Sequence, residues 1–131
     1  MELDLIEYDI DPNVKKQVEN ALQNLLTKTS ASVVMLTDDA GRIVSIKGGH
    51  YKETERDFLA TLISGVFGAA VEMGKILKME DLEVLQYESK SMDVVIKFIP
   101  PRFLLGVIVE EGHSLSKRQA FMGQWTVPAS S

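Results

Sequence analysis

The sequence has no cysteine, and it has only two histidines among its 131 residues. Without cysteine the chain can form neither a disulfide framework nor a thiolate nucleophile. His50 and His113 leave few candidates for a catalytic base, and none of the patterns G-x-S-x-G, H-E-x-x-H and G-x-x-x-x-G-K-[ST] occurs. A metal site needs three or four converging ligands, which one histidine in a turn does not supply. We therefore expect no enzyme, no metal and no cofactor.

Basic residues are also scarce. Lysine and arginine number 14 against 19 aspartates and glutamates, for a net charge of −5. Binding to a nucleic-acid backbone depends on clustered basic side chains, so we expect no nucleic acid as a partner. The first ten residues begin with acids and lack the basic and apolar regions of a secretory signal. We expect a cytoplasmic protein.

The apolar pattern predicts one α+β domain with a five-stranded antiparallel sheet, in the order α-β-β-α-β-β-β-α. The predicted elements are a helix at 12–29, strands at 31–37 and 42–47, a helix at 53–77, strands at 82–89, 92–99 and 103–110, and a short helix at 114–119. Asp11 and Pro12 suit a helix start, and Gly41 suits a positive φ in the first hairpin. The domain covers residues 1–119 with an N-terminal arm at 1–11, and residues 120–131 form a C-terminal tail.

Adjacent acids occur at Asp38-Asp39 and at Glu110-Glu111, both in predicted turns. Acid–base catalysis needs two carboxyl groups that converge on one substrate, whereas neighbours in a turn point apart. We interpret both pairs as solvated surface residues.

The helix at 53–77 is apolar on more sides than a surface helix needs, because a single apolar stripe is enough to cover a sheet. The first stripe consists of Phe58, Leu62, Val66, Ala69, Met73 and Ile76. The second stripe consists of Leu59, Ile63, Phe67, Ala70, Gly74 and Leu77. We predict that this helix is covered twice, once by its own sheet and once by something else.

A membrane span is the obvious competing interpretation of this helix. Residues 58–71 carry no charge, but this run is shorter than the ~20 residues that a span requires. Charged side chains bracket it at Arg56, Asp57, Glu72 and Lys75. We therefore expect no membrane insertion.

Three glycines, Gly65, Gly68 and Gly74, lie inside the same helix, where each costs roughly 1 kcal/mol relative to alanine. Small residues at this spacing allow a second backbone to approach closely. The alternatives are that the glycines are unselected or that they make room for the sheet beneath.

With this layout the chain resembles the roadblock (roadblock/dynein light chain) family, in the bacterial and archaeal branch that partners small Ras-like GTPases. The similarity lies in the hairpin at 33–44, in the helix start at 59–65, and in the strand at 104–109 followed by Gly112 and Lys117-Arg118. The resemblance implies a roadblock/longin-like fold without catalytic residues.

The resemblance also implies a homodimer, in which two central helices pack together and two sheets join edge to edge through the strand that follows the helix. The interface residues expected from it are Leu62, Gly65, Val66, Ala69, Met73, Leu85, Gln86 and Tyr87. Members of the family bind a GTPase and alter its nucleotide cycle, or they serve as scaffolds. The expected GTPase contacts are Arg56, Thr61, Ser64, Gly68, Glu72 and Lys75.

Three functions are therefore open at this point. The first is a non-catalytic homodimeric regulator of a small Ras-like GTPase, acting as activator or adaptor. The second is a structural adaptor that bridges a larger assembly irrespective of nucleotide state, with residues 121–127 as a docking tail. The third is a small-molecule sensor that holds a ligand between sheet and helix.

Overall fold

The computed structural model describes residues 11–110. Its elements are α2 (Pro12–Thr29), β1 (Val33–Asp38), β2 (Ile43–Gly48), α3 (Glu53–Leu77), β3 (Val84–Glu88), β4 (Met92–Ile99) and β5 (Phe103–Glu110). Both helices have the bounds predicted from the sequence, and the strand ends differ from the prediction by at most two residues. The short helix predicted at 114–119, the tail and nearly all of the N-terminal arm lie outside the described residues.

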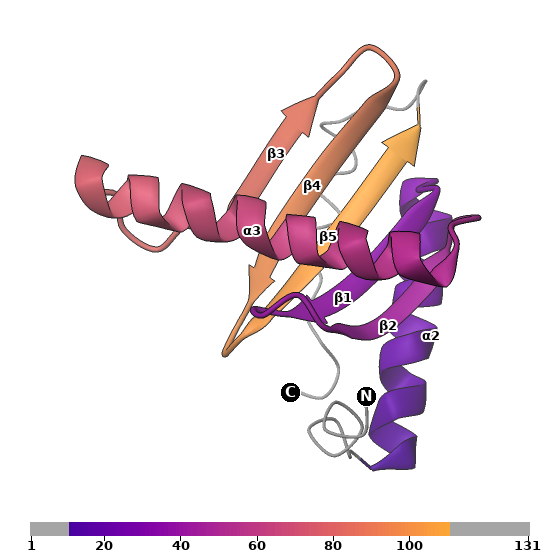
Figure 1. The fold of residues 1–131 in the computed structure, drawn as a ribbon. Helices are drawn as coiled ribbons and strands as arrows, with labels where there is room; N and C mark the ends of the chain where they lie inside the picture. The colour runs from indigo at the N-terminus through magenta and orange to yellow at the C-terminus, as the bar shows by residue number, and fades with distance from the viewer. Residues whose placement is uncertain (1–10, 111–131) are drawn as a thin grey trace.

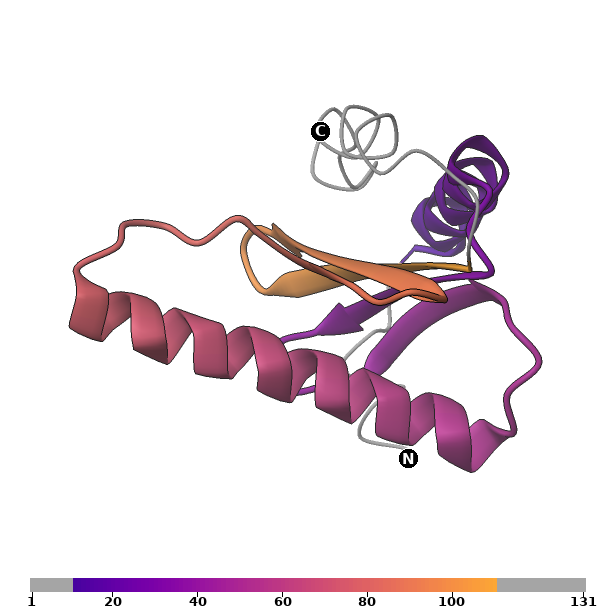
Figure 2. The same cartoon turned by 90° about the horizontal axis from the view of Figure 1, so that it is seen from above.

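All five strands form one antiparallel sheet in the order β2-β1-β5-β4-β3, with α2 and α3 on opposite faces (Figures 1 and 2). The fold class predicted from the sequence is thus confirmed for the described part of the chain. The apolar run in β5 predicts a central strand covered on both faces. β5 does lie in the middle of the sheet, and its residues from Leu104 to Val109 are all buried.

The core has two halves, one on each face of the sheet. On one face, Val18, Leu22 and Leu25 of α2 pack against β1 and β5. On the other face, side chains of α3 pack against β1, β4 and β5; they are Ala60, Ile63 and Phe67. The alternation of side chains along each strand divides the apolar residues between these two layers.

Helix α2 begins as the sequence predicts. The Asp11 Oδ1 accepts a hydrogen bond of 2.8 Å from the Asn13 backbone N–H, and Pro12 occupies the first turn, where no donor is needed. At the other end, Ser30 adopts the left-handed conformation with φ of 55° and donates its N–H to Leu26 and Thr27.

The turn between β1 and β2 corrects one interpretation made from the sequence. Asp38 is not a solvated surface acid, because its exposed fraction is 0%. Its Oδ1 accepts hydrogen bonds from the backbone N–H groups of Ala40 (2.9 Å) and Arg42 (2.8 Å). Its Oδ2 lies 2.9 Å from the Arg42 Nε. The buried carboxylate therefore stabilises the hairpin through hydrogen bonds to the backbone and side chain of its own turn.

Gly41 occupies the place where this hairpin meets α3. Its φ is +84°, and a Cβ atom added there would lie 2.9 Å from the Thr61 Cα and 3.3 Å from the Ala60 carbonyl oxygen. The predicted positive φ is confirmed. The contact with the α3 backbone is a second requirement for glycine, and it depends on the packing of two distant segments.

We expect Gly41→Ala to lower the free energy of unfolding by about 2–3 kcal/mol, because it adds both a left-handed strain and a backbone clash. Denaturant unfolding followed by circular dichroism measures this loss. Gly68→Ala is the matched control, since its Cβ would meet no atom of residues 11–110 within 4 Å. In the separated protomer, Gly68→Ala should leave the free energy of unfolding unchanged or raise it by up to ~1 kcal/mol. A Gly41→Ala protein as stable as the wild type would contradict the predicted clash.

Candidate functional site

Helix α3 is buried on one side only. The fully buried residues of the helix are Ala60, Ile63, Phe67 and Gly74, and the first three pack against the sheet. The Phe67 ring stacks on Phe98 of β4 with 6.2 Å between the ring centroids. The sheet thus covers most of the second stripe, although Leu77 at its end is 64% exposed.

The first stripe is the open surface of the molecule. Its exposed fractions are 65% for Phe58, 61% for Met73 and 81% for Ile76, and the three residues between them are exposed as well. Large apolar side chains that are contiguous on a surface mark an interaction site more often than isolated ones do. Among residues 11–110 no element covers this stripe, so the second cover stays a prediction.

The glycines differ in what surrounds them. Gly65 and Gly68 would direct a Cβ into space that holds no atom of residues 11–110 within 4 Å. They therefore do not make room for the sheet, so that alternative is wrong for these two positions. Gly74 is buried, and its Cβ would lie 3.6 Å from the Met79 Cβ. Of the three glycines, Gly74 alone has a neighbour among residues 11–110 that a Cβ would contact.

Strand β3 forms the edge of the sheet beside this surface. It pairs with β4 alone among the described strands, and Tyr87 is 49% exposed. Between β3 and the C-terminal half of α3 lies a hollow of about 460 Å³, here called the β3 groove. Its lining includes six of the eight expected interface residues: Val66, Ala69, Met73, Leu85, Gln86 and Tyr87.

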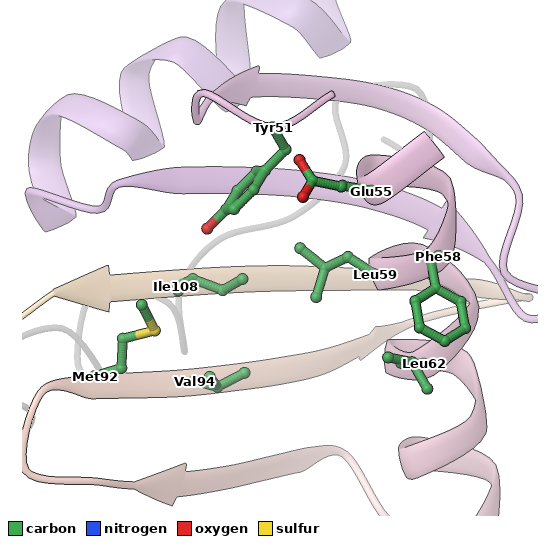
Figure 3. Close-up of a pocket in the computed structure, with 8 residues that line it drawn as sticks. All are labelled: Tyr51, Glu55, Phe58, Leu59, Leu62, Met92, Val94 and Ile108. Atoms are coloured by element: carbon green, nitrogen blue, oxygen red, sulfur yellow. The ribbon is translucent and has the colours of Figure 1, made fainter. Parts of the chain in front are cut away.

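A second hollow, of about 360 Å³, lies on the same face between the N-terminal half of α3 and the ends of β4 and β5 (Figure 3). We call it the α3–β4 cavity. It is lined by Tyr51, Glu55, Phe58, Leu59, Leu62, Met92, Val94 and Ile108. The Glu55 carboxylate already accepts a hydrogen bond of 2.9 Å from the Lys52 backbone N–H. The remaining walls are almost entirely apolar, so the cavity favours an apolar occupant. No pattern in the sequence predicts this cavity, because the residues that line it are far apart in the chain.

The six expected GTPase contacts do not form one surface. Thr61, Gly68, Glu72 and Lys75 are exposed on the outer side of α3, where Glu72 and Lys75 form an ion pair of 2.7 Å. Ser64 is half-buried and donates a hydrogen bond of 2.6 Å to the Asp39 carbonyl oxygen.

Arg56 belongs to a different side of the helix. It precedes the buried residues Ala60 and Ile63 by four and seven positions, which places it on the sheet-facing side. Its Nε is buried without a hydrogen-bond partner, the only such side-chain nitrogen or oxygen among residues 11–110. Arg56 therefore stands apart from the four residues of the outer row.

The described residues contain no group of three or more histidine, cysteine, aspartate or glutamate side chains arranged to hold a metal ion. By length and composition alone, α3 is apolar enough to cross a membrane. Core helices of globular domains also meet those two criteria, and here α3 packs Ala60, Ile63 and Phe67 against its own sheet. The expectation that the protein does not insert into a membrane stays a prediction.

These features define a small α+β domain with an exposed apolar helix face beside strand β3, which pairs with β4 alone among the strands of residues 11–110. Such a surface is suited to binding protein. The chain belongs to the Roadblock/LC7 domain family, whose sequence model matches residues 17–109. The family predicted from the sequence is confirmed. An uncharacterized protein from Aquifex aeolicus is 32% identical over 122 residues, which cover 92% of this chain and 75% of that protein.

Solved structures agree with this fold. MglB from Myxococcus xanthus has a TM-score of 0.79 at 19% identity, with 88% of this chain and 86% of that chain covered. The gliding protein MglB from Thermus thermophilus also has a TM-score of 0.79, at 20% identity and 88% and 87% coverage. A Roadblock/LC7 domain from Streptomyces avermitilis has a TM-score of 0.72 at 16% identity, covering 80% and 88%. At these identities the likeness shows the fold.

Proposed function

We propose that this protein is a non-catalytic, cytoplasmic regulator of a small Ras-like GTPase and that it acts as a homodimer. The observation that carries the homodimer is the exposed apolar stripe of α3 beside the open edge of β3. Phe58, Met73 and Ile76 alone expose more than half of their surface each. Burying one side chain of this size stabilises a complex by about 1.5–3 kcal/mol, so association that covers the stripe is strongly favoured.

Family membership supports the GTPase as partner, and self-association has a parallel among the similar structures. One of them holds MglB in a tetrameric arrangement, with a TM-score of 0.79 to this chain. A C2 dimer places the same patch of both copies at the interface. The stripe and the β3 edge are then buried, and the outer row of Thr61, Gly68, Glu72 and Lys75 remains accessible to a further protein.

The proposal assigns regulation to repositioning of the GTPase's own switch residues. No arginine lies in the outer row, and Arg56 faces the sheet. Stabilising a partner's switch segments changes its hydrolysis rate without a catalytic group from the regulator.

Capture of partners on the immobilised protein tests this proposal, in parallel with GDP and with a non-hydrolysable GTP analogue. We expect mass spectrometry to find a Ras-like GTPase enriched in the analogue lane. The same partners in both lanes with no GTPase among them would instead favour the structural adaptor and end the regulatory proposal.

The outer row is tested by Lys75→Glu, which breaks the pair with Glu72 and makes this surface acidic. We expect capture of the GTPase to fall about fivefold to tenfold, as for the loss of a charge at the rim of an interface. Lys28→Glu is the matched control, since it makes the same change of charge at the exposed end of α2, on the opposite face of the sheet. Equal loss in both variants would show that only net charge matters and that the outer row is not the contact.

A further inference from the structure

Strand β2 forms the second edge of the sheet, opposite β3, and it pairs with β1 alone among the strands of residues 11–110. Its ladder with β1 is regular from Ser45 to Gly48, because the irregular step lies between Ile43 and Ser45. In such a ladder every second residue directs its N–H and C=O groups away from the partner strand. Within the described chain, residues 45–47 make no backbone hydrogen bond outside this ladder. The outer side of β2 can therefore accept one more strand.

The surroundings of this edge are basic, although the protein as a whole is acidic. Residues 40–52 hold three lysine or arginine side chains and no aspartate or glutamate. Arg56 follows in the first turn of α3, which begins close to the end of β2 in the chain, and its Nε is buried without a hydrogen-bond partner. The three acids of residues 53–57 belong to the helix rather than to the strand. The edge therefore favours an occupant that supplies carboxylates.

The N-terminal arm has the complementary composition. Residues 1–10 contain no lysine or arginine and four acids, which are Glu2, Asp4, Glu7 and Asp9. Acids alternate with large apolar residues at 2–5 and again at 7–10, which is the period of a strand. An extended segment of this kind matches a basic strand edge both in backbone hydrogen bonding and in charge.

The arm is also attached where it can reach β2. Helix α2 begins at Pro12 and packs on β1 and β2. Only residues 30–32 separate α2 from β1, so the chain reverses there and α2 runs in the same sense as β2 (Figure 1). The last turn of α2 meets the end of β2, where a Cβ added at Gly48 would lie 3.1 Å from the Leu26 Cδ1. The start of α2 therefore lies toward the start of β2, and ten extended residues, about 33 Å, are enough to return along it.

The acids of the arm match the bases of the edge on both faces of the sheet. Asp4 and Glu7 are three positions apart, so they project to opposite faces of an extended strand. Lys47 lies on the α2 face, because its ladder partner Val34 packs in the core on that side. Arg56 belongs to α3, on the other face.

We propose that residues 2–10 add to β2 as a sixth strand, antiparallel to it, with carboxylates of the arm paired to Lys47 and Arg56. Because the arm is tethered, its effective concentration at the edge is on the order of millimolar, and weak contacts are enough to hold it. The added strand occupies an edge through which the sheet would otherwise be able to join other chains. The proposal depends neither on the GTPase nor on the apolar surface of α3.

Amide hydrogen exchange, followed by NMR on the full chain, tests this pairing. In the wild type we expect all N–H groups of residues 45–48 to be protected, on both sides of the strand. In Asp4→Lys/Glu7→Lys, the outward N–H groups should exchange at least about tenfold faster, while those bonded to β1 keep their rates. The matched control is Glu80→Lys/Glu83→Lys, which makes the same change of net charge at exposed positions before β3. It should leave exchange in β2 unchanged.

Adding Lys47→Glu to the arm variant restores opposite charges, so it should slow the exchange of the outward groups again. Rapid exchange of these groups in the wild type would overturn the proposal, because the edge is then open. Protection that survives the arm variant would also overturn it and would assign the edge to another occupant. If that occupant is a second copy of the chain, the protection falls on dilution.

Discussion

Ala69→Glu should halve the solution mass of the protein. Ala69 is exposed in the single chain and lies near the middle of the apolar stripe, where two helices would approach most closely. Burying an unpaired carboxylate there costs several kcal/mol, and each 1.4 kcal/mol raises the dissociation constant tenfold. We therefore expect the dissociation constant of the dimer to rise at least about a hundredfold. Sedimentation equilibrium, or light scattering after gel filtration, measures the resulting loss of mass.

The matched control for this variant is Asn24→Glu, which introduces the same charge at an exposed position of α2. It should keep the mass of the wild-type dimer. Glutamate has a good helix propensity, so Ala69→Glu should also retain its helical circular dichroism spectrum. A wild-type dimer whose mass is unaffected by Ala69→Glu would show that the helix face is not the interface.

Asp38→Ala should lower the free energy of unfolding by about 2–4 kcal/mol, the largest loss of stability that we predict. The change removes the acceptor of two backbone hydrogen bonds and the partner of Arg42, all inside a turn that α3 covers. Hydrogen bonds to charged groups contribute about 1.5–3 kcal/mol each, and breaking a buried pair leaves donors without an acceptor. The Arg42 side chain is 36% exposed and can reach water, which reduces the loss.

Chemical denaturation of Asp38→Ala beside Asp39→Ala checks this prediction. Asp39 is the neighbouring acid, but its residue is exposed, and its contact with α3 uses the backbone carbonyl rather than the carboxylate. We expect Asp39→Ala to change stability by no more than about 0.5 kcal/mol. Similar losses in the two variants would show that the buried carboxylate has no special role. Both proteins should be measured at a single concentration, because the proposed dimerisation would add to the apparent stability.

The two neighbouring acids also show where a sequence pattern stops being informative. Asp38 and Asp39 are the same residue type at adjacent positions of one turn, so the sequence pattern predicts the same solvated environment for both. Burial of Asp38 depends on the hairpin folding back on its own carboxylate and on α3 passing above Gly41. The only local signal is the glycine three residues later, which indicates a tight turn but not what covers it.

The expected GTPase contacts failed to form one surface for a related reason. Helical spacing places Thr61, Gly68, Glu72 and Lys75 on one side, and this was predicted correctly from the sequence. Arg56 is also among the expected contacts. Its position relative to Ala60 and Ile63 places it toward the sheet, and the sheet-facing side of the helix was not identified from the pattern alone.

Local patterns in the sequence are enough to predict the seven described helices and strands, the central position of β5, and a second apolar stripe on α3. These follow from periodicity, caps and turn residues, which are properties of neighbouring positions. Tertiary packing determines which stripe the sheet covers, which acid is buried, and where the two hollows lie. Those outcomes depend on the angle and length with which α3 crosses the sheet, and segments far apart in the chain must pack together before that crossing exists.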